Sequence, residues 1–177
     1  MSTPAKWVID PTHSEVQFKV KHLVITTVTG QFNEFSGEAT ASDDFSDAQV
    51  SFEAKIDSIS TNNEARDGHL KSEEFFAADQ YPTLKFVSTG ITKKDEDSFV
   101  LNGDLTLRGV TKPVALEVEY GGTVVDPYGQ TKAGFELKGK INRKDFGLTW
   151  SAVTEAGGAV VSDEVRLIAN VQFVKQA

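Results

Sequence analysis

Apolar and polar residues alternate along most of this chain. Val16, Phe18 and Val20 are separated by Gln17 and Lys19. Successive side chains of a strand leave opposite faces, so the apolar residues share one face and the polar residues share the other. The same alternation recurs in residues 50–56, 84–86, 114–120, 135–141 and 165–173. The pattern predicts strands that each have one buried and one solvated face.

Residues that favour chain reversal lie between these segments, at 95–98, 108–110, 121–122 and 127–129. Short connections of this kind join antiparallel neighbours. Asn102-Gly103 is typical of a hairpin turn, yet Leu101 and Leu105 keep one parity through it. We therefore interpret Gly103 as a bend or bulge within one strand. About eight strands are expected, which indicates an all-β barrel or sandwich.

Residues 58–82 depart from the alternation. Thr61 followed by Glu64 has the form of a capping box, in which each side chain satisfies a free backbone N–H at the start of a helix. The pattern predicts one short helix near residues 62–76. This helix would carry Arg66, Asp67 and His69 immediately before an apolar stretch.

Length and charge limit the function. The 177 residues fit one domain, 1–177, and the net charge of -8 disfavours a nucleic-acid partner. No apolar run reaches the roughly 18 residues of a membrane span, so no integral membrane segment is expected. The sequence as given has no signal peptide, which predicts a cytoplasmic protein, or a periplasmic one if a leader was removed. The absence of cysteine leaves the redox compartment open.

The interior of the predicted barrel can be hollow or solid. The chain has twelve phenylalanines, and several inward positions are small, such as Ala54, Ala133, Gly139 and Ala169. Large rings beside small residues can enclose a cavity for one small ligand. The same residues can also interdigitate to fill a core, and periodicity does not separate the two alternatives.

Four ordered motifs resemble one family. They are Trp7-Val-Ile-Asp-Pro-Thr-His13-Ser-Glu-Val-Gln-Phe18, the segment 58–82, Gly103-Asp-Leu-Thr-Leu-Arg-Gly-Val-Thr-Lys-Pro113 and Asn142-Arg-Lys-Asp-Phe-Gly147. Together they are similar to the YceI-like, lipid-binding family, from about Trp7 to Phe173. The resemblance implies an extended, antiparallel, lipocalin-like barrel. It also implies that an apolar tunnel holds an amphiphile with a long isoprenoid tail, such as a ubiquinone-like quinone or a polyprenyl phosphate.

These patterns suggest which residues would contact such a ligand. The predicted tunnel is lined by twelve apolar residues, namely Phe18, Val20, Phe52, Ile56, Leu70, Phe75, Phe86, Leu105, Leu116, Phe135, Phe146 and Ala169. Arg66, His69 and Arg143 are the candidates for a polar head group, because arginine offers paired donors to a phosphate, carboxylate or quinone oxygen. Arg66 and Asp67 can equally serve to tie the helix to neighbouring strands, and Arg143 can equally have a structural role.

We expect this protein to bind a lipid and to carry or store it, and we do not expect it to be an enzyme. One rival is a hydrolase or isomerase that uses Asp67 and His69 as acid and base, although no nucleophile motif accompanies them. Another is a stress-related protein with a solid barrel that serves only protein contacts. The three histidines have no metal-ligand spacing, so no metal is expected. Neither glycine-rich phosphate motif is present, so no nucleotide cofactor is expected. The sequence leaves open whether the barrel forms a homodimer. The loop at 154–162 is predicted to lie at one end of the barrel, near the opening of the ligand tunnel.

Overall fold

The structure is a computed structural model that describes residues 4–22, 25–73, 75–148 and 161–176. The described chain is built almost wholly of strands. The strands are β1 (Ala5–Ile9), β2 (Glu15–His22), β3 (Thr26–Phe32), β4 (Phe35–Ala41), β5 (Gln49–Lys55), β6 (Ile59–Ser60), β7 (Thr83–Lys93), β8 (Ser98–Leu107), β9 (Val110–Val125), β10 (Thr131–Asn142) and β11 (Val161–Lys175). The helical segments are η1 (Pro11–His13), η2 (Ile56–Ser58), α1 (Glu64–Lys71) and η3 (Arg143–Phe146).

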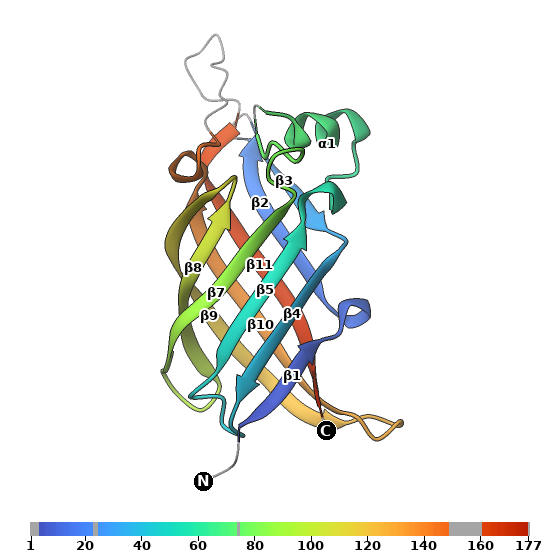
Figure 1. Ribbon diagram of the computed structural model, residues 1–177, viewed down its shortest axis with the longest axis vertical. Coiled ribbons are helices and arrows are strands. Elements are labelled where there is room, and N and C mark those ends of the chain that lie inside the picture. The colour runs from blue at the N-terminus through green and yellow to red at the C-terminus, as the bar shows by residue number, and fades with distance from the viewer. Residues whose placement is uncertain (1–3, 23–24, 74, 149–160, 177) are drawn as a thin grey trace.

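Eight antiparallel strands close into a barrel in the order β1-β4-β5-β7-β8-β9-β10-β11 (Figure 1). Strand β1 makes the closure, because it pairs with β4 on one side and with β11 on the other. The pairing with β11 covers Trp7–Ile9 against Phe173–Lys175. The prediction of an all-β, antiparallel barrel of about eight strands is confirmed.

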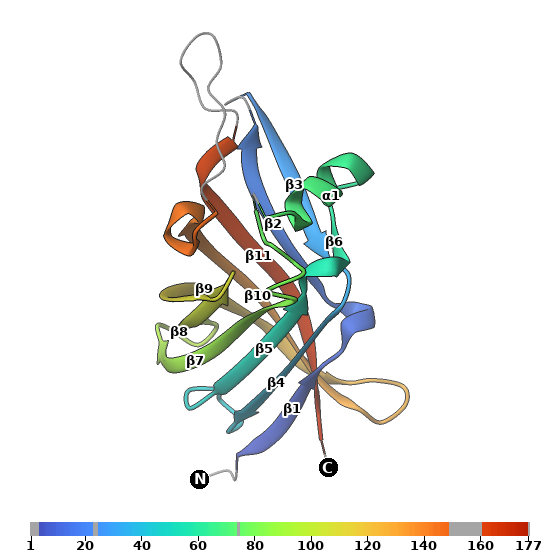
Figure 2. The same ribbon diagram turned by 45° about the horizontal axis from the view of Figure 1, so that its top comes forward.

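Strand β2 takes over the pairing with β11 where β1 ends. Pro11 has no backbone N–H for a ladder, and Asp10 caps the short η1 by accepting from the Thr12 N–H, so the chain leaves the barrel wall here. It then returns as β2 to the same edge of β11, at Glu15–Val20. Strands β3 and β6 extend the sheet from β2, and α1 lies near them at one end of the barrel (Figure 2). We call this the helix end, and the end where the two termini lie the termini end.

The predicted faces are confirmed along the strands. In β9, for example, Val114, Leu116 and Val118 are buried or half-buried, while Glu117 and Glu119 are exposed. Strand β8 runs unbroken through Gly103, as the parity of its neighbours predicts. The bulge itself lies in the partner strand β7, where the register shifts between Ser88 and Gly90 opposite Gly103.

The helix is confirmed but is shorter than the predicted 62–76, and its cap was assigned to the wrong residue. Asn63 is the N-cap, and its side chain accepts from the Arg66 N–H at 3.0 Å. Thr61 is buried two residues earlier, where its N–H and hydroxyl donate to Asp67 Oδ1 at 2.8 and 2.6 Å. The helix therefore begins at Glu64 and ends at Lys71.

Candidate functional site

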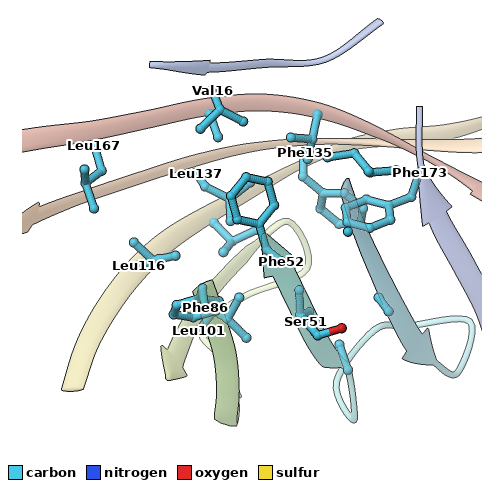
Figure 3. A pocket seen from close by; sticks show the side chains of 18 of the residues that line it. Val16, Ser51, Phe52, Phe86, Leu101, Leu116, Phe135, Leu137, Leu167 and Phe173 are labelled. Atoms are coloured by element: carbon cyan, nitrogen blue, oxygen red, sulfur yellow. The ribbon is translucent and has the colours of Figure 1, made fainter. Parts of the chain in front are cut away.

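An apolar cavity lies inside the barrel. Its volume is about 180 Å³. An apolar cavity of about 150 Å³ is enough to hold a benzene-sized ligand. Figure 3 shows Phe52, Phe86 and Leu116, which come from β5, β7 and β9, directed into the same interior space. Gln17 and Ser51 are the polar residues along the described lining, and no charged side chain belongs to it.

Glycines on the inner face make room for the large side chains of the wall. A Cβ atom on Gly103 would lie 2.4 Å from Phe86 Cζ, and one on Gly139 would lie 2.5 Å from Leu116 Cδ2. Both distances are well below van der Waals contact. Phe86 and Leu116 therefore each occupy space beside the neighbouring strand that a Cβ atom would otherwise fill.

Aromatic rings gather at the termini end of the cavity. Phe45, in the connection between β4 and β5, has its ring 5.5 Å from that of Trp7, 5.3 Å from that of Tyr120 and 5.1 Å from that of Phe135. Its backbone has φ of +61°, which is costly for a non-glycine residue. Asp44 and Asp47 support this conformation by accepting hydrogen bonds from Ser42 and Ser46. Phe45 thus covers the cavity from a tightly bonded turn.

The structure places seven of the twelve predicted tunnel residues along the cavity, namely Phe18, Phe52, Phe86, Leu105, Leu116, Phe135 and Ala169. The other five do not line it. Ile56 and Phe146 lie in η2 and η3 and are each 2 % exposed, and Phe75 is buried in the same apolar core. Leu70 packs against that core from α1, and Val20 lies two residues beyond the lining residue Phe18 on β2. For all twelve residues, contact with a ligand stays a prediction.

Arg66 and Asp67 form a compact group with Thr61. The Arg66 Nε donates to Thr61 Oγ1, and its Nη2 donates to the Thr61 carbonyl oxygen, both at 2.8 Å. Asp67 receives the two Thr61 donors. This geometry ties the start of α1 to the residue that follows β6, and neither charged side chain lines the cavity.

His69 and Arg143 also lie away from the cavity lining. The His69 ring meets that of Phe75 edge to face, with centroids 5.0 Å apart. Arg143 is 2 % exposed and donates from Nε to the Ser162 carbonyl and from Nη1 to the Leu148 carbonyl, at 2.9 and 2.6 Å. Burial lowers the pKa of Arg143, and Asp163, with Oδ1 3.8 Å from Nη2, opposes that effect. Arg143 therefore joins η3 to the start of β11.

Trp7 and Phe45 line the cavity and were not among the predicted lining residues. Trp7 and Ile9 are two residues apart and therefore share one face of β1. This alternation could have indicated that Trp7 faces the interior. Phe45 stands in a polar turn without periodicity, so no sequence signal places it inside. The loop predicted at 154–162 lies outside the described residues up to position 160.

The described residues contain no group of three or more His, Asp or Glu side chains placed to hold a metal ion. Asp44 and Asp47 are engaged by serines, and His13 lies 2.8 Å from Asp10 at η1. Along the described chain, no helix is both long enough and apolar enough to cross a membrane.

A closed antiparallel barrel around an apolar cavity defines a class of proteins that can enclose one hydrophobic molecule. A model of the YceI-like domain matches residues 7–173, and the chain belongs to this family. Protein YceI of Salmonella newport (strain SL254) is 41 % identical over 165 residues, which are 93 % of this chain and 83 % of that protein.

Two solved structures have the same fold. The YCEI protein of Campylobacter jejuni aligns with a TM-score of 0.77 and 32 % identity, over 89 % of this chain and 90 % of that one. A polyisoprenoid binding domain from Saccharophagus degradans aligns with a TM-score of 0.64 and 16 % identity, over 98 % of this chain and 100 % of that one.

Proposed function

We propose that this protein binds an amphiphile with an isoprenoid tail inside its barrel and carries or stores it. The observation that carries this proposal is the cavity, whose described lining is apolar except for Gln17 and Ser51. Transfer of each CH₂ from water into such surroundings contributes about 0.8 kcal/mol, so each five-carbon unit contributes on the order of 3 to 4 kcal/mol before entropy costs. The Saccharophagus degradans domain, described as polyisoprenoid binding, shares the fold and supports the same ligand class.

We propose a carrier and not a catalyst. Asp67 and His69, the candidate acid and base, do not line the cavity. Asp67 Oδ1 receives two hydrogen bonds from Thr61, and the His69 ring packs on Phe75. A general base must reach the proton that it abstracts, directly or through one water. The candidate ligands are a ubiquinone-like quinone and a polyprenyl phosphate.

Organic extraction of the purified protein, followed by mass spectrometry, tests the function. We expect an isoprenoid lipid at a fixed ratio to protein, and its mass should be unchanged after long incubation with excess protein. A folded protein that yields no lipid and takes up none from detergent would contradict the proposal. A product of altered mass would show catalysis.

The variant Phe86→Asp should abolish lipid retention, because an unpaired charge in an apolar cavity is costly. The matched control is Val124→Asp, at a β9 position that is 65 % exposed. Phe52→Asp, at a half-buried lining position, provides a second test if Phe86→Asp does not fold. Circular dichroism identifies the folded variants. Full retention of lipid by folded Phe86→Asp and Phe52→Asp proteins would exclude the cavity as the binding site.

A further inference from the structure

Trp7 carries a buried hydrogen-bond donor that has no partner. Among the described residues, Trp7 Nε1 and Arg108 Nε are the buried side-chain nitrogen atoms without one. Arg108 is anchored by its other two nitrogens, which donate to the carbonyl oxygens of Gly147 and Glu73. Trp7 has no other side-chain donor. Of these two residues, only Trp7 lines the cavity.

A buried N–H that makes no hydrogen bond has lost its hydration without replacement. A ligand atom that accepts from it recovers that free energy, whereas an apolar ligand does not. On the basis of the proposed function, we propose that the Trp7 indole N–H is the polar anchor of the cavity. It recognises an uncharged acceptor, a carbonyl or hydroxyl oxygen, in the head group of the isoprenoid ligand.

The position of Trp7 suits a head group. Trp7 pairs with Ala39 of β4, and its ring lies against Phe45 at the termini end. Ala39 and Ala48 line both the cavity and a groove on the barrel surface beside β4, β5 and β7. Strands β5 and β7 pair only as far as Ser51 and Val87, and beyond that point Val50 N–H donates to Ser88 Oγ. Trp7 therefore lies beside a part of the cavity wall that adjoins a polar groove.

The charges at this end do not favour an anion. The groove contains Lys6, which pairs with Glu38 at 3.0 Å, and Asp47, which accepts from Ser42. The nearby Lys175 has its ammonium 6.0 Å from the centroid of the Trp7 ring. Lys6 and Lys175 are matched by Glu38 and Asp47, and Asp44 of the same turn adds a further carboxylate, so these groups carry no net positive charge. Positive charge or paired cationic donors favour a phosphate, whereas a carbonyl or hydroxyl group needs only a donor.

Three probes test the assignment: farnesol, farnesene and farnesyl phosphate. They share the same isoprenoid tail and differ in the head group. Trp7→Phe keeps an aromatic ring and removes the donor. We expect this variant to bind farnesol about 5- to 100-fold more weakly than the wild type does, the effect of one lost hydrogen bond. Its affinity for farnesene should stay within about twofold, and wild-type protein should prefer farnesol to farnesyl phosphate.

A second measurement does not depend on the variant's folding. In ¹H–¹⁵N spectra of wild-type protein, farnesol should move the Trp7 Nε1–H proton downfield, and farnesene should not. The assignment is overturned if Trp7→Phe weakens both neutral probes equally, if the indole proton responds to both alike, or if farnesyl phosphate binds at least tenfold better than farnesol. Binding that is unaffected by Trp7→Phe overturns the assignment and leaves the proposed function standing. Failure of all three probes to bind would overturn both.

Discussion

At the scale of single residues, the width of the cavity depends on glycines that face large side chains. Gly103 is the clearest case, because an added Cβ would lie 2.4 Å from Phe86 Cζ and 2.7 Å from the Val87 carbonyl oxygen. The Phe86 ring or the backbone would have to move to make room for a Cβ here. Glycine is therefore required at this position for steric reasons, without any unusual backbone angle.

We expect Gly103→Ala to lower the free energy of unfolding by about 1 to 3 kcal/mol, the usual cost of overpacking, and to weaken lipid binding by moving Phe86 into the cavity. The control is Gly134→Ala in β10, where nothing lies within 4 Å of the added Cβ. Urea denaturation and lipid titration measure the two effects. Equal stability of the two variants would show that the Phe86 ring adapts without cost.

At the scale of elements, the short η1 is the corner that separates β1 from β2. Asp10 organises it, because Oδ1 accepts from the Thr12 N–H and hydroxyl, and Oδ2 lies 2.8 Å from His13 Nδ1. Hydrogen bonds from Thr12 first, and then from His13, lower the pKa of Asp10 from 3.8 to about 2. Strand β1 pairs on both sides immediately before this corner. The ionised form of Asp10 therefore stabilises the segment that closes the barrel.

This pKa gives a definite dependence of stability on pH. A carboxyl group whose pKa is lower in the folded state contributes stability above its unfolded pKa, and loses it as the pH falls through the folded pKa. We expect Asp10→Asn to be less stable than wild type at pH 5. The difference should shrink as the pH falls from about 4 to about 2. Urea denaturation at several pH values measures it. A difference that stayed constant with pH would mean that the charge of Asp10 has no part in it.

At the scale of the whole molecule, the structure distinguishes small residues that border the cavity from those in solid packing. Ala169 lines the cavity, whereas Ala54 is fully buried and does not. Both belong to the barrel wall, in β11 and β5. A large side chain can extend into empty space from the first position and must displace packed neighbours at the second.

We expect Ala169→Trp to be destabilised less than Ala54→Trp, for which overpacking should cost about 1 to 3 kcal/mol or more. The Ala169→Trp protein should also retain lipids with shorter tails than the wild type retains. Thermal denaturation and mass spectrometry of the extracted lipid measure the two effects. If Ala169→Trp were the less stable of the two and its lipid unchanged, Ala169 would not border the ligand.

Sequence alone determined the features that depend on local pattern. Alternation identified the strands and their buried faces, and the parity across Asn102-Gly103 identified β8 as one strand. Four sequence motifs by themselves indicated the family. These features were predictable because the side chains of a strand point alternately to its two faces, whatever the strand later pairs with.

Only the tertiary structure decided which apolar residues enclose the cavity. Ile56, Phe75 and Phe146 are as apolar as Phe52 and Phe86, but only the latter two border the cavity. It also decided the closure through β1, the engagement of Arg66 and Asp67 with Thr61, and the unpartnered donor of Trp7. Each depends on pairing between segments that are distant in sequence or on the precise path of a turn. Periodicity reports that a face is buried, but it does not report what that face is buried against.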